Sequence, residues 1–244
     1  MTWVYMLRGK HEVLRCFQDF HKLVANQFDA RIRITRTDNG KKYVNNVFEA
    51  YLSEHGIIHQ TTCPDTPSQN GVAERKNRHL LEVARSMMFQ MHVPKYLWSE
   101  AVLTAAYLIN RMPSRILGMA SPAELLLEQH EFKVPPKVFG CVCFVRDHRP
   151  SVGKLDPQAV KCIFVGYSST QKGYKCWDPV GKKLFVSMDV TFRESEPYYT
   201  KPCDLHLFLE EFSPVIEGDR REGENQQEVI VGTIPCPMDM PEVS

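Results

Sequence analysis

Apolar and polar positions along the chain follow two periodicities, one typical of helices and the other of strands. Between Glu12 and Phe28, large apolar residues recur every three or four positions, as on one face of an amphipathic helix. Further helices are predicted over residues 44–55 with Gly56 as the C-cap, over 70–92, over 97–110 and from Ser121 onward. Short β-prone runs at 3–7, 30–34 and 57–62 predict strands. The first half of the chain is therefore predicted to be α/β.

The pattern changes after Pro135 and Pro136. Four short β-rich runs, joined by turns that contain glycine or proline, follow at 138–145, 162–167, 174–177 and 184–192. They predict a small all-β module. The last residues are acidic, rich in proline and poor in aromatic side chains, so we expect them to be largely disordered. Four parts are thus predicted: an α/β segment at 1–112, a helical connection at 113–136, the β module at 137–193 and the tail at 194–244.

Composition excludes several classes of protein. The chain has 244 residues, of which 43% are hydrophobic and 24% charged. No window approaches the run of about 20 apolar residues that a membrane span needs. The first residues lack the apolar core and cleavage site of a signal peptide, so we expect a soluble, intracellular chain. The eight cysteines form no CxxC pair. Cys141 and Cys143 fall on one face of a predicted strand, which favours structural thiols over zinc ligands.

The net charge of +1 is an average over two unlike parts. Residues 1–200 carry 27 basic and 19 acidic side chains, a net charge of +8, whereas residues 201–244 carry 3 basic and 10 acidic ones, a net charge of −7. A basic body is compatible with a nucleic-acid partner without requiring one.

Two acidic residues, Asp38 and Glu74, stand where a metal could bind. Asp38 comes just past a predicted strand, and Glu74 lies in the first turns of a predicted helix, with 35 residues between them. Two such carboxylates can converge on a hard cation such as Mg²⁺. The spacing alone is also compatible with an alternative to a metal site, namely an Asx turn at Asp38 and an exposed helical glutamate at position 74.

The surrounding residues point to a known family. RTDNG at 36–40 and TPSQNGVAERKN at 66–77 resemble the second half of the DDE catalytic core of integrases, in particular the copia-type class of LTR retrotransposons. The resemblance continues through LWSEAVLTAAYLINRMPS, SPAELL, KVFGCVCFV, KLDPQAVKCIFVGYSSTQKGYKCWDP and VSMDVTF. It covers residues 2–195.

The resemblance implies a fold and a reaction. The fold is an α/β, RNase H-like integrase catalytic core that lacks its first two strands, followed by a helical connection and a small all-β module. Asp38 and Glu74 become the second and third catalytic acids and ligands of two Mg²⁺ or Mn²⁺ ions. Enzymes of this family are polynucleotidyl transferases, in which a 3′-hydroxyl of element DNA attacks a target phosphodiester. The first acid, on a strand upstream of Trp3, is missing, so we expect this chain alone to be inactive.

Four residues around Glu74 are candidates for contact with nucleic acid. The resemblance places Asn70 at the end of a mobile loop that touches element DNA. Arg78 lies four residues after Glu74 and so projects from the same helical face, where a cation can hold a phosphate. Arg75 and Lys76 flank the site, and solvated surface charge explains them equally well. At Leu81, where retroviral relatives often carry a basic residue, the resemblance therefore offers no second basic contact.

Partners and rival functions follow from the same resemblance. It implies binding of element ends and target DNA, homo-oligomers and action in the nucleus, with no membrane and no small-molecule substrate. A non-catalytic DNA-binding or interaction module derived from a transposon remnant is the alternative, and the missing first acid favours it. A generic metal-dependent nuclease is disfavoured by the β module. Six lysines of that module offer a further DNA-binding face or serve only solubility: Lys154, Lys161, Lys172, Lys175, Lys182 and Lys183.

Overall fold

The structure is a computed structural model of all 244 residues and describes residues 1–63, 71–127, 134–146, 157–200 and 228–233, the last of these by its backbone. Two compact units divide the chain. One contains Met1–Arg78 and Asp219–Ser244, and the other contains His79–Gly218. The division falls inside helix α3 (Gly71–Gln90).

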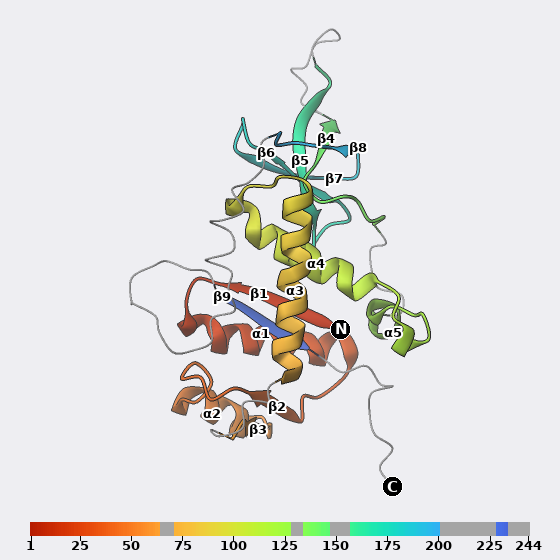
Figure 1. Cartoon of the computed structure of the whole chain (residues 1–244). Coiled ribbons are helices and arrows are strands. Elements are labelled where there is room, and N and C mark those ends of the chain that lie inside the picture. Colours follow the sequence, from red (N-terminus) through yellow and green to blue (C-terminus); the bar gives the residue numbers. More distant parts are fainter. Residues whose placement is uncertain (64–70, 128–133, 147–156, 201–227, 234–244) are drawn as a thin grey trace. The chain divides into compact units, whose positions relative to one another are not determined.

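The described residues of the first unit form two pairs of strands and two helices besides the start of α3. The elements are β1 (Thr2–Leu7), a 3-10 turn at Lys10–Glu12, α1 (Val13–Phe28), β2 (Ile34–Thr37), α2 (Asn46–Glu54), β3 (Ile58–Thr61) and β9 (Glu228–Thr233). Strand β1 pairs with β9 antiparallel, and β2 pairs with β3 parallel (Figure 1).

The core of the first unit forms where α1 and α2 bury their apolar faces. Its fully buried members are Leu7, Val13, Phe48, Leu52 and Ile57. Phe17 of α1 packs on Phe48 of α2 with ring centroids 5.2 Å apart. Both predicted helices are confirmed, and the periodic apolar residues of α1 are buried or partly buried.

The N-terminus of α2 is capped as its sequence suggests. The side chain of Asn45 accepts a hydrogen bond from the backbone N–H of Phe48 at 2.9 Å, and Gly56 adopts the positive φ that a helix C-terminus favours.

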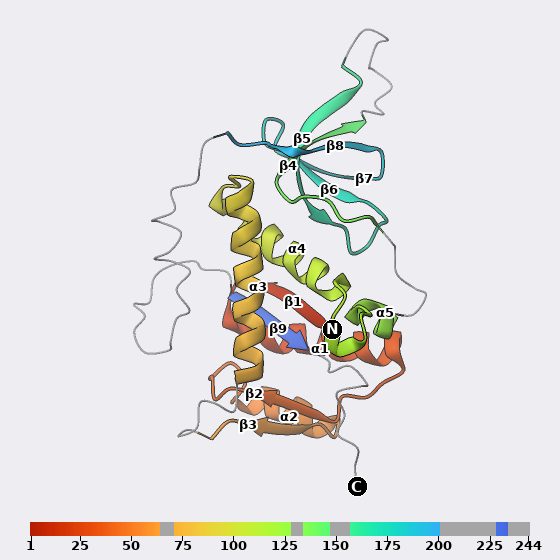
Figure 2. The same ribbon diagram turned by 45° about the vertical axis from the view of Figure 1, so that its right-hand side comes forward.

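The second unit joins helices to a five-stranded antiparallel sheet. Besides the end of α3 it contains a 3-10 turn at Lys95–Leu97, α4 (Trp98–Arg111), a 3-10 turn at Arg115–Leu117, α5 (Pro122–Leu127), β4 (Cys141–Arg146), β5 (Ala159–Tyr167), β6 (Tyr174–Asp178), β7 (Lys183–Ser187) and β8 (Val190–Pro197). The strand order is β7-β6-β5-β4-β8 (Figure 2). The capping pair at α5 is reciprocal: Glu124 N–H donates to Ser121 Oγ at 3.2 Å and Ser121 N–H donates to Glu124 Oε2 at 2.8 Å.

Helix α4 packs directly on β5. Thr104 donates from Oγ1 to the carbonyl of Val165 at 3.2 Å, and the ring of Tyr107 stacks on Tyr167 with centroids 3.8 Å apart. The predicted β module at 137–193 therefore shares a core with helices that the sequence assigned to other parts.

The buried cysteines confirm the expectation of structural thiols. Cys141 and Cys143 of β4, with Cys162 and Cys176, are free and fully buried, and Cys143 faces Cys162 across the β4–β5 ladder. Burial raises the pKa of the Cys141 and Cys162 thiols to about 12, so they stay protonated and act as small apolar side chains.

Three predicted boundaries differ from the structure. Strand β2 begins at Ile34, where the predicted strand ended, because residues 34–37 pair with β3. The run at 184–192 is two strands, β7 and β8, with Met188 and Asp189 between them. The predicted disordered tail at 194–244 contains the end of β8 and all of β9; its other residues after 200 lie outside the described part of the chain.

The mixed α/β class with a small all-β module is confirmed. Among the helices that the structure describes, none combines the length and the apolar character needed to cross a membrane.

Candidate metal centre and nucleic-acid interface

Asp38 follows the last residue of β2 and its position is fixed by local hydrogen bonds. Its carboxylate Oδ1 accepts from Gly40 N–H at 3.0 Å, which forms an Asx turn. Thr37, which is buried, bonds through Oγ1 to His59 Nε2 at 2.8 Å and donates to the Asp38 carbonyl at 2.9 Å. The side-chain amide of Asn39 donates to the carbonyl of Thr62 at 2.7 Å. The loop is thereby attached to β3.

The Asp38 carboxylate keeps one oxygen available. Within the described residues Gly40 N–H is the one donor to this half-buried side chain, so Oδ2 has no partner there. A carboxylate that is held in place by one oxygen and open at the other suits a hard cation such as Mg²⁺.

Glu74 lies in the first turn of α3 and is exposed. It belongs to the same compact unit as Asp38. In the described part of the chain, no three or more His, Cys, Asp or Glu side chains gather in a group that could hold a metal.

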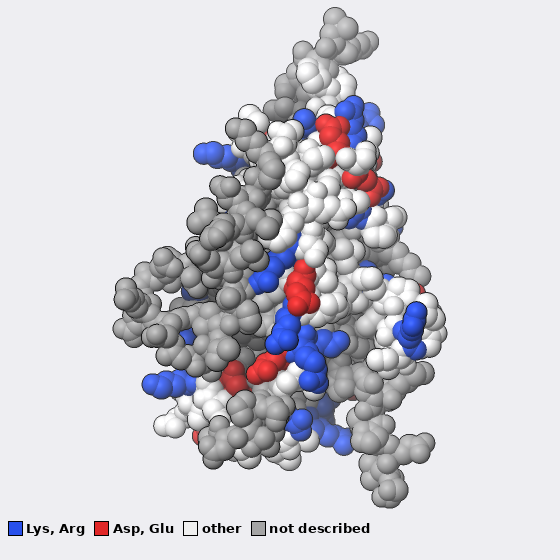
Figure 3. Space-filling view, in the orientation of Figure 1, with Lys and Arg blue, Asp and Glu red and all other residues white. Residues whose placement is uncertain are grey.

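The start of α3 carries the candidate DNA contacts. Every residue from Val72 to His79 is exposed, Arg75, Lys76 and Arg78 among them. Figure 3 shows lysine and arginine side chains along the exposed surface of α3 with acidic side chains among them. Asn70, the fourth predicted contact, lies outside the described residues.

The lysines of the β module divide by their surroundings. Lys175 forms an ion pair with Glu100 of α4, in which Nζ lies 3.0 Å from Oε2, and both side chains are partly buried. Lys161 lies over the ring of Tyr198, 5.4 Å from its centroid, and Lys183 lies 4.7 Å from that of Phe185. Lys154 lies outside the described residues. Lys175 is thus a structural residue.

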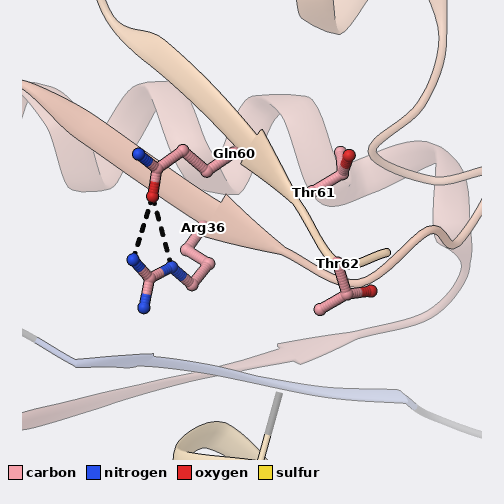
Figure 4. A pocket seen from close by; sticks show the side chains of 4 residues that line it. All are labelled: Arg36, Gln60, Thr61 and Thr62. Carbon is pink, nitrogen blue, oxygen red and sulfur yellow. Dashed lines mark hydrogen bonds between the residues drawn. The ribbon is translucent and has the colours of Figure 1, made fainter. Parts of the chain in front are cut away.

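A pocket of about 450 Å³ lies beside the end of the β2–β3 pair. One of its lining residues, Arg36, precedes Asp38 by two positions in the sequence. Its lining is Arg36, Gln60, Thr61 and Thr62 (Figure 4). Arg36 and Gln60 are register partners, and Gln60 Oε1 accepts from Arg36 Nε at 3.3 Å and Nη2 at 2.9 Å. The sequence analysis missed this pair because it ended the strand at residue 34, and the parallel pairing of 34–37 with 58–61 is visible only in the structure.

Comparisons with known proteins begin with the sheet of the second unit. A family model for the retroviral polymerase SH3-like domain matches residues 141–205, which include β4 to β8.

Relatives in sequence match most of the chain. It is 45% identical over 194 residues to the retrovirus-related Pol polyprotein from transposon TNT 1-94 of Nicotiana tabacum, a match that covers 80% of this chain and 15% of the relative. It is 40% identical over 193 residues to the Pol polyprotein from transposon RE2 of Arabidopsis thaliana, covering 79% of this chain and 13% of the relative. The chain is homologous to retrovirus-related Pol polyproteins of transposons, as its motifs predicted, and spans about a seventh of their length.

Among the solved structures that match the chain are two from retroviral integrases, both with low TM-scores. One is the HTLV-2 integrase catalytic core domain in complex with magnesium, in a trimeric form, with a TM-score of 0.37 and 16% identity over 49% of this chain and 70% of that one. Another is a simian T-cell lymphotropic virus intasome bound to a PP2A regulatory subunit, with a TM-score of 0.37 and 15% identity over 78% of this chain and 66% of that one.

Proposed function

We propose that this chain is the integrase segment of a retrotransposon Pol polyprotein, with the later part of a catalytic core followed by an SH3-like module. The observation that carries the proposal is the placement of Asp38 directly after β2 and of Glu74 in the first turn of α3. These are the positions at which the sequence resembles the last two acids of DDE integrases. The identity of 45% over 194 residues to a transposon Pol polyprotein supports it.

The role proposed for Asp38 and Glu74 is to hold Mg²⁺ or Mn²⁺. The hydrogen bond from Gly40 N–H restrains Asp38 through one carboxylate oxygen, which supports this role because the other oxygen stays available. When bound, such ions activate a hydroxyl and stabilise the leaving oxygen of a phosphodiester. Since the described residues add no third acid to this pair, we expect the chain alone to perform no strand transfer.

The proposed partner is DNA, both element ends and target. The exposed start of α3 places Arg78 one turn after Glu74, so that a phosphate beside the metal could meet a cation. Arg75 and Lys76 add positive charge to the same exposed segment. Oligomers and action in the nucleus belong to the same proposal, by analogy with integrases.

The second candidate function is a DNA-binding or interaction module without catalysis. It is favoured by the exposure of Glu74 and by the lack of a third acid within the described residues. The two candidates share DNA binding and differ in the role of the acids.

The test is the joining of a short element-end oligonucleotide to plasmid DNA with Mg²⁺ or Mn²⁺. We expect the chain alone to join no DNA. We expect joining once the upstream acid-bearing segment is added, and Glu74→Gln in that complemented protein should abolish it. Joining by the chain alone that Glu74→Gln abolishes would refute the expected inactivity. Failure of the complemented protein to join would favour the non-catalytic module.

Binding of the same oligonucleotide tests the interface. Arg78→Gln should weaken binding and make the negative slope of log K against log salt shallower by about one. The matched control is Arg115→Gln, which removes the same charge from an exposed site outside α3. Equal losses in both variants would contradict the assignment of α3.

A further inference from the structure

The small sheet of the first unit is built from segments that lie far apart in the sequence. Strand β9 pairs antiparallel with β1 in a continuous register from Thr2 opposite Thr233 to Leu7 opposite Glu228. Among the described strands, these two form a sheet of their own (Figure 1). The backbone of β1 is therefore satisfied along one edge by residues 228–233.

Strand β1 is held in place by contacts that do not involve β9. The ring of Trp3 packs against Phe20 and Phe28 of α1, with centroids 5.5 and 5.9 Å apart. Tyr5 packs against Phe20 at 6.4 Å, and Leu7, which is 1% exposed, belongs to the core of the unit. Helix α1 thus fixes β1, and the edge of β1 would persist if β9 left.

Strand β9 has a weaker hold on the unit. Its ladder is to β1 alone among the described strands, and a pair of strands is marginal in water without further support. Its sequence, EVIVGT, contains three consecutive β-branched residues, Val229, Ile230 and Val231, which favour an extended conformation. Such an element can open locally while the rest of the unit stays folded.

We propose that the edge of β1 is a strand-addition site for an extended peptide rich in β-branched residues, and that residues 228–233 are its detachable occupant. Pairing of main-chain groups provides the attraction, and this mode of recognition needs only an exposed edge and an extended partner. The occupant assigned here is a segment of the same chain, because β9 pairs with β1 and lies in the same compact unit. A segment of similar chemistry from elsewhere can exchange with β9.

The test is hydrogen exchange of the β1 amides in the full chain and in Val229→Pro/Ile230→Pro. In an antiparallel ladder the N–H groups of alternate residues point to the partner, so one of two consecutive prolines removes a donor to β1. The matched control, Val229→Thr/Ile230→Thr, keeps both donors and the β-branched character. We expect exchange in β1 to accelerate about tenfold or more in the proline variant alone, while α2 amides keep their protection.

A synthetic peptide of residues 226–235 added to the proline variant provides the second arm. Restored protection of β1 would support the strand-addition site. The proposal is overturned if β1 exchange is unchanged by the prolines, if α2 loses protection together with β1, or if the peptide restores nothing. Sedimentation of the unmodified chain completes the test. A monomer with protected β1 supports pairing within one chain, and a dimer whose β1 protection falls on dilution overturns it.

Discussion

The hydroxyl of Thr104 on α4 occupies the space that a side chain at Gly166 of β5 would need. A Cβ built on Gly166 would lie 2.5 Å from Thr104 Oγ1, and the backbone there has a φ of +136°. The same hydroxyl donates to the neighbouring Val165 carbonyl. Helix and sheet approach this closely only because residue 166 has no side chain.

We predict that Gly166→Ala destabilises the second unit by about 2 to 4 kcal/mol, because overpacking and backbone strain add. Urea unfolding measures the change. The matched control is Gly118→Ala, at φ +62° with nothing within 4 Å of the new Cβ, which should cost about 1 kcal/mol from strain alone. Thr104→Ala in the Gly166→Ala background should recover part of the loss, and strict additivity of the two changes would contradict the contact.

The β module should depend on α4 for its stability. Ala101, Val102, Thr104 and Ala105 of α4 are all at most 2% exposed, and Gly140 at the start of the module packs against Met91 and Val93. A fragment of residues 79–200 should unfold cooperatively, whereas residues 137–200 should melt at lower temperature or without a cooperative transition, by circular dichroism. Equal melting of the two fragments would show that the module is independent.

The pair Lys137–Glu194 should make the second unit sensitive to acid. Their side chains lie 2.7 Å apart, and Glu194 Oε2 also accepts from Val138 N–H at 3.2 Å. The hydrogen bond from Lys137 lowers the pKa of Glu194. A lowered folded-state pKa gives stability that is present above the unfolded value of about 4.3 and is lost as the pH falls through the folded value.

We therefore expect Glu194→Gln to cost less than about 1 kcal/mol at pH 7, because the pair is partly exposed. The difference from the unmodified chain should shrink toward zero as the pH falls below about 4. Urea unfolding at pH 7 and pH 3 compares the two proteins. A difference that stays the same at both values would rule out the ionised pair as its cause.

Loss of the cap on α2 should destabilise the first unit. Asn45→Ala removes the acceptor of the Phe48 N–H and should cost about 1 kcal/mol in the free energy of unfolding. Asn46→Ala, one residue further along at the first exposed position of the helix, is the control and should be neutral or slightly stabilising. Equal effects of the two changes would mean that the cap contributes nothing.

Asp38 and Glu74 should share one cation. Added Mn²⁺ should broaden the amide signals of Asn39 and Arg75 at the same metal concentration, and Asp38→Asn should weaken both effects. Asp29→Asn, at an exposed acid after α1, is the control. Ligand oxygens lie about 2.0–2.1 Å from Mg²⁺, so carboxylates more than about 10 Å apart in an experimental structure would contradict the shared site.

The sequence by itself determined the elements whose signals are local. Helix α1 follows from its apolar periodicity, the C-terminus of α2 from Gly56, and the start of α5 from the reciprocal pair Ser121 and Glu124. The motifs around Asp38 and Glu74 identified the homologues. Each of these signals depends on residues within a few positions of one another, or on short sequence motifs.

Only the tertiary structure decided the pairings between distant segments. Ile34–Thr37 became a strand because β3 pairs with it, which placed Asp38 directly at the strand end and joined Arg36 to Gln60. Residues 228–233 became a strand because β1 offers an edge. Helix α4 joined the β module because Thr104 fits over Gly166. The physical reason is the same throughout: a strand's hydrogen bonds and a helix's packing face are completed by partners that local sequence does not specify.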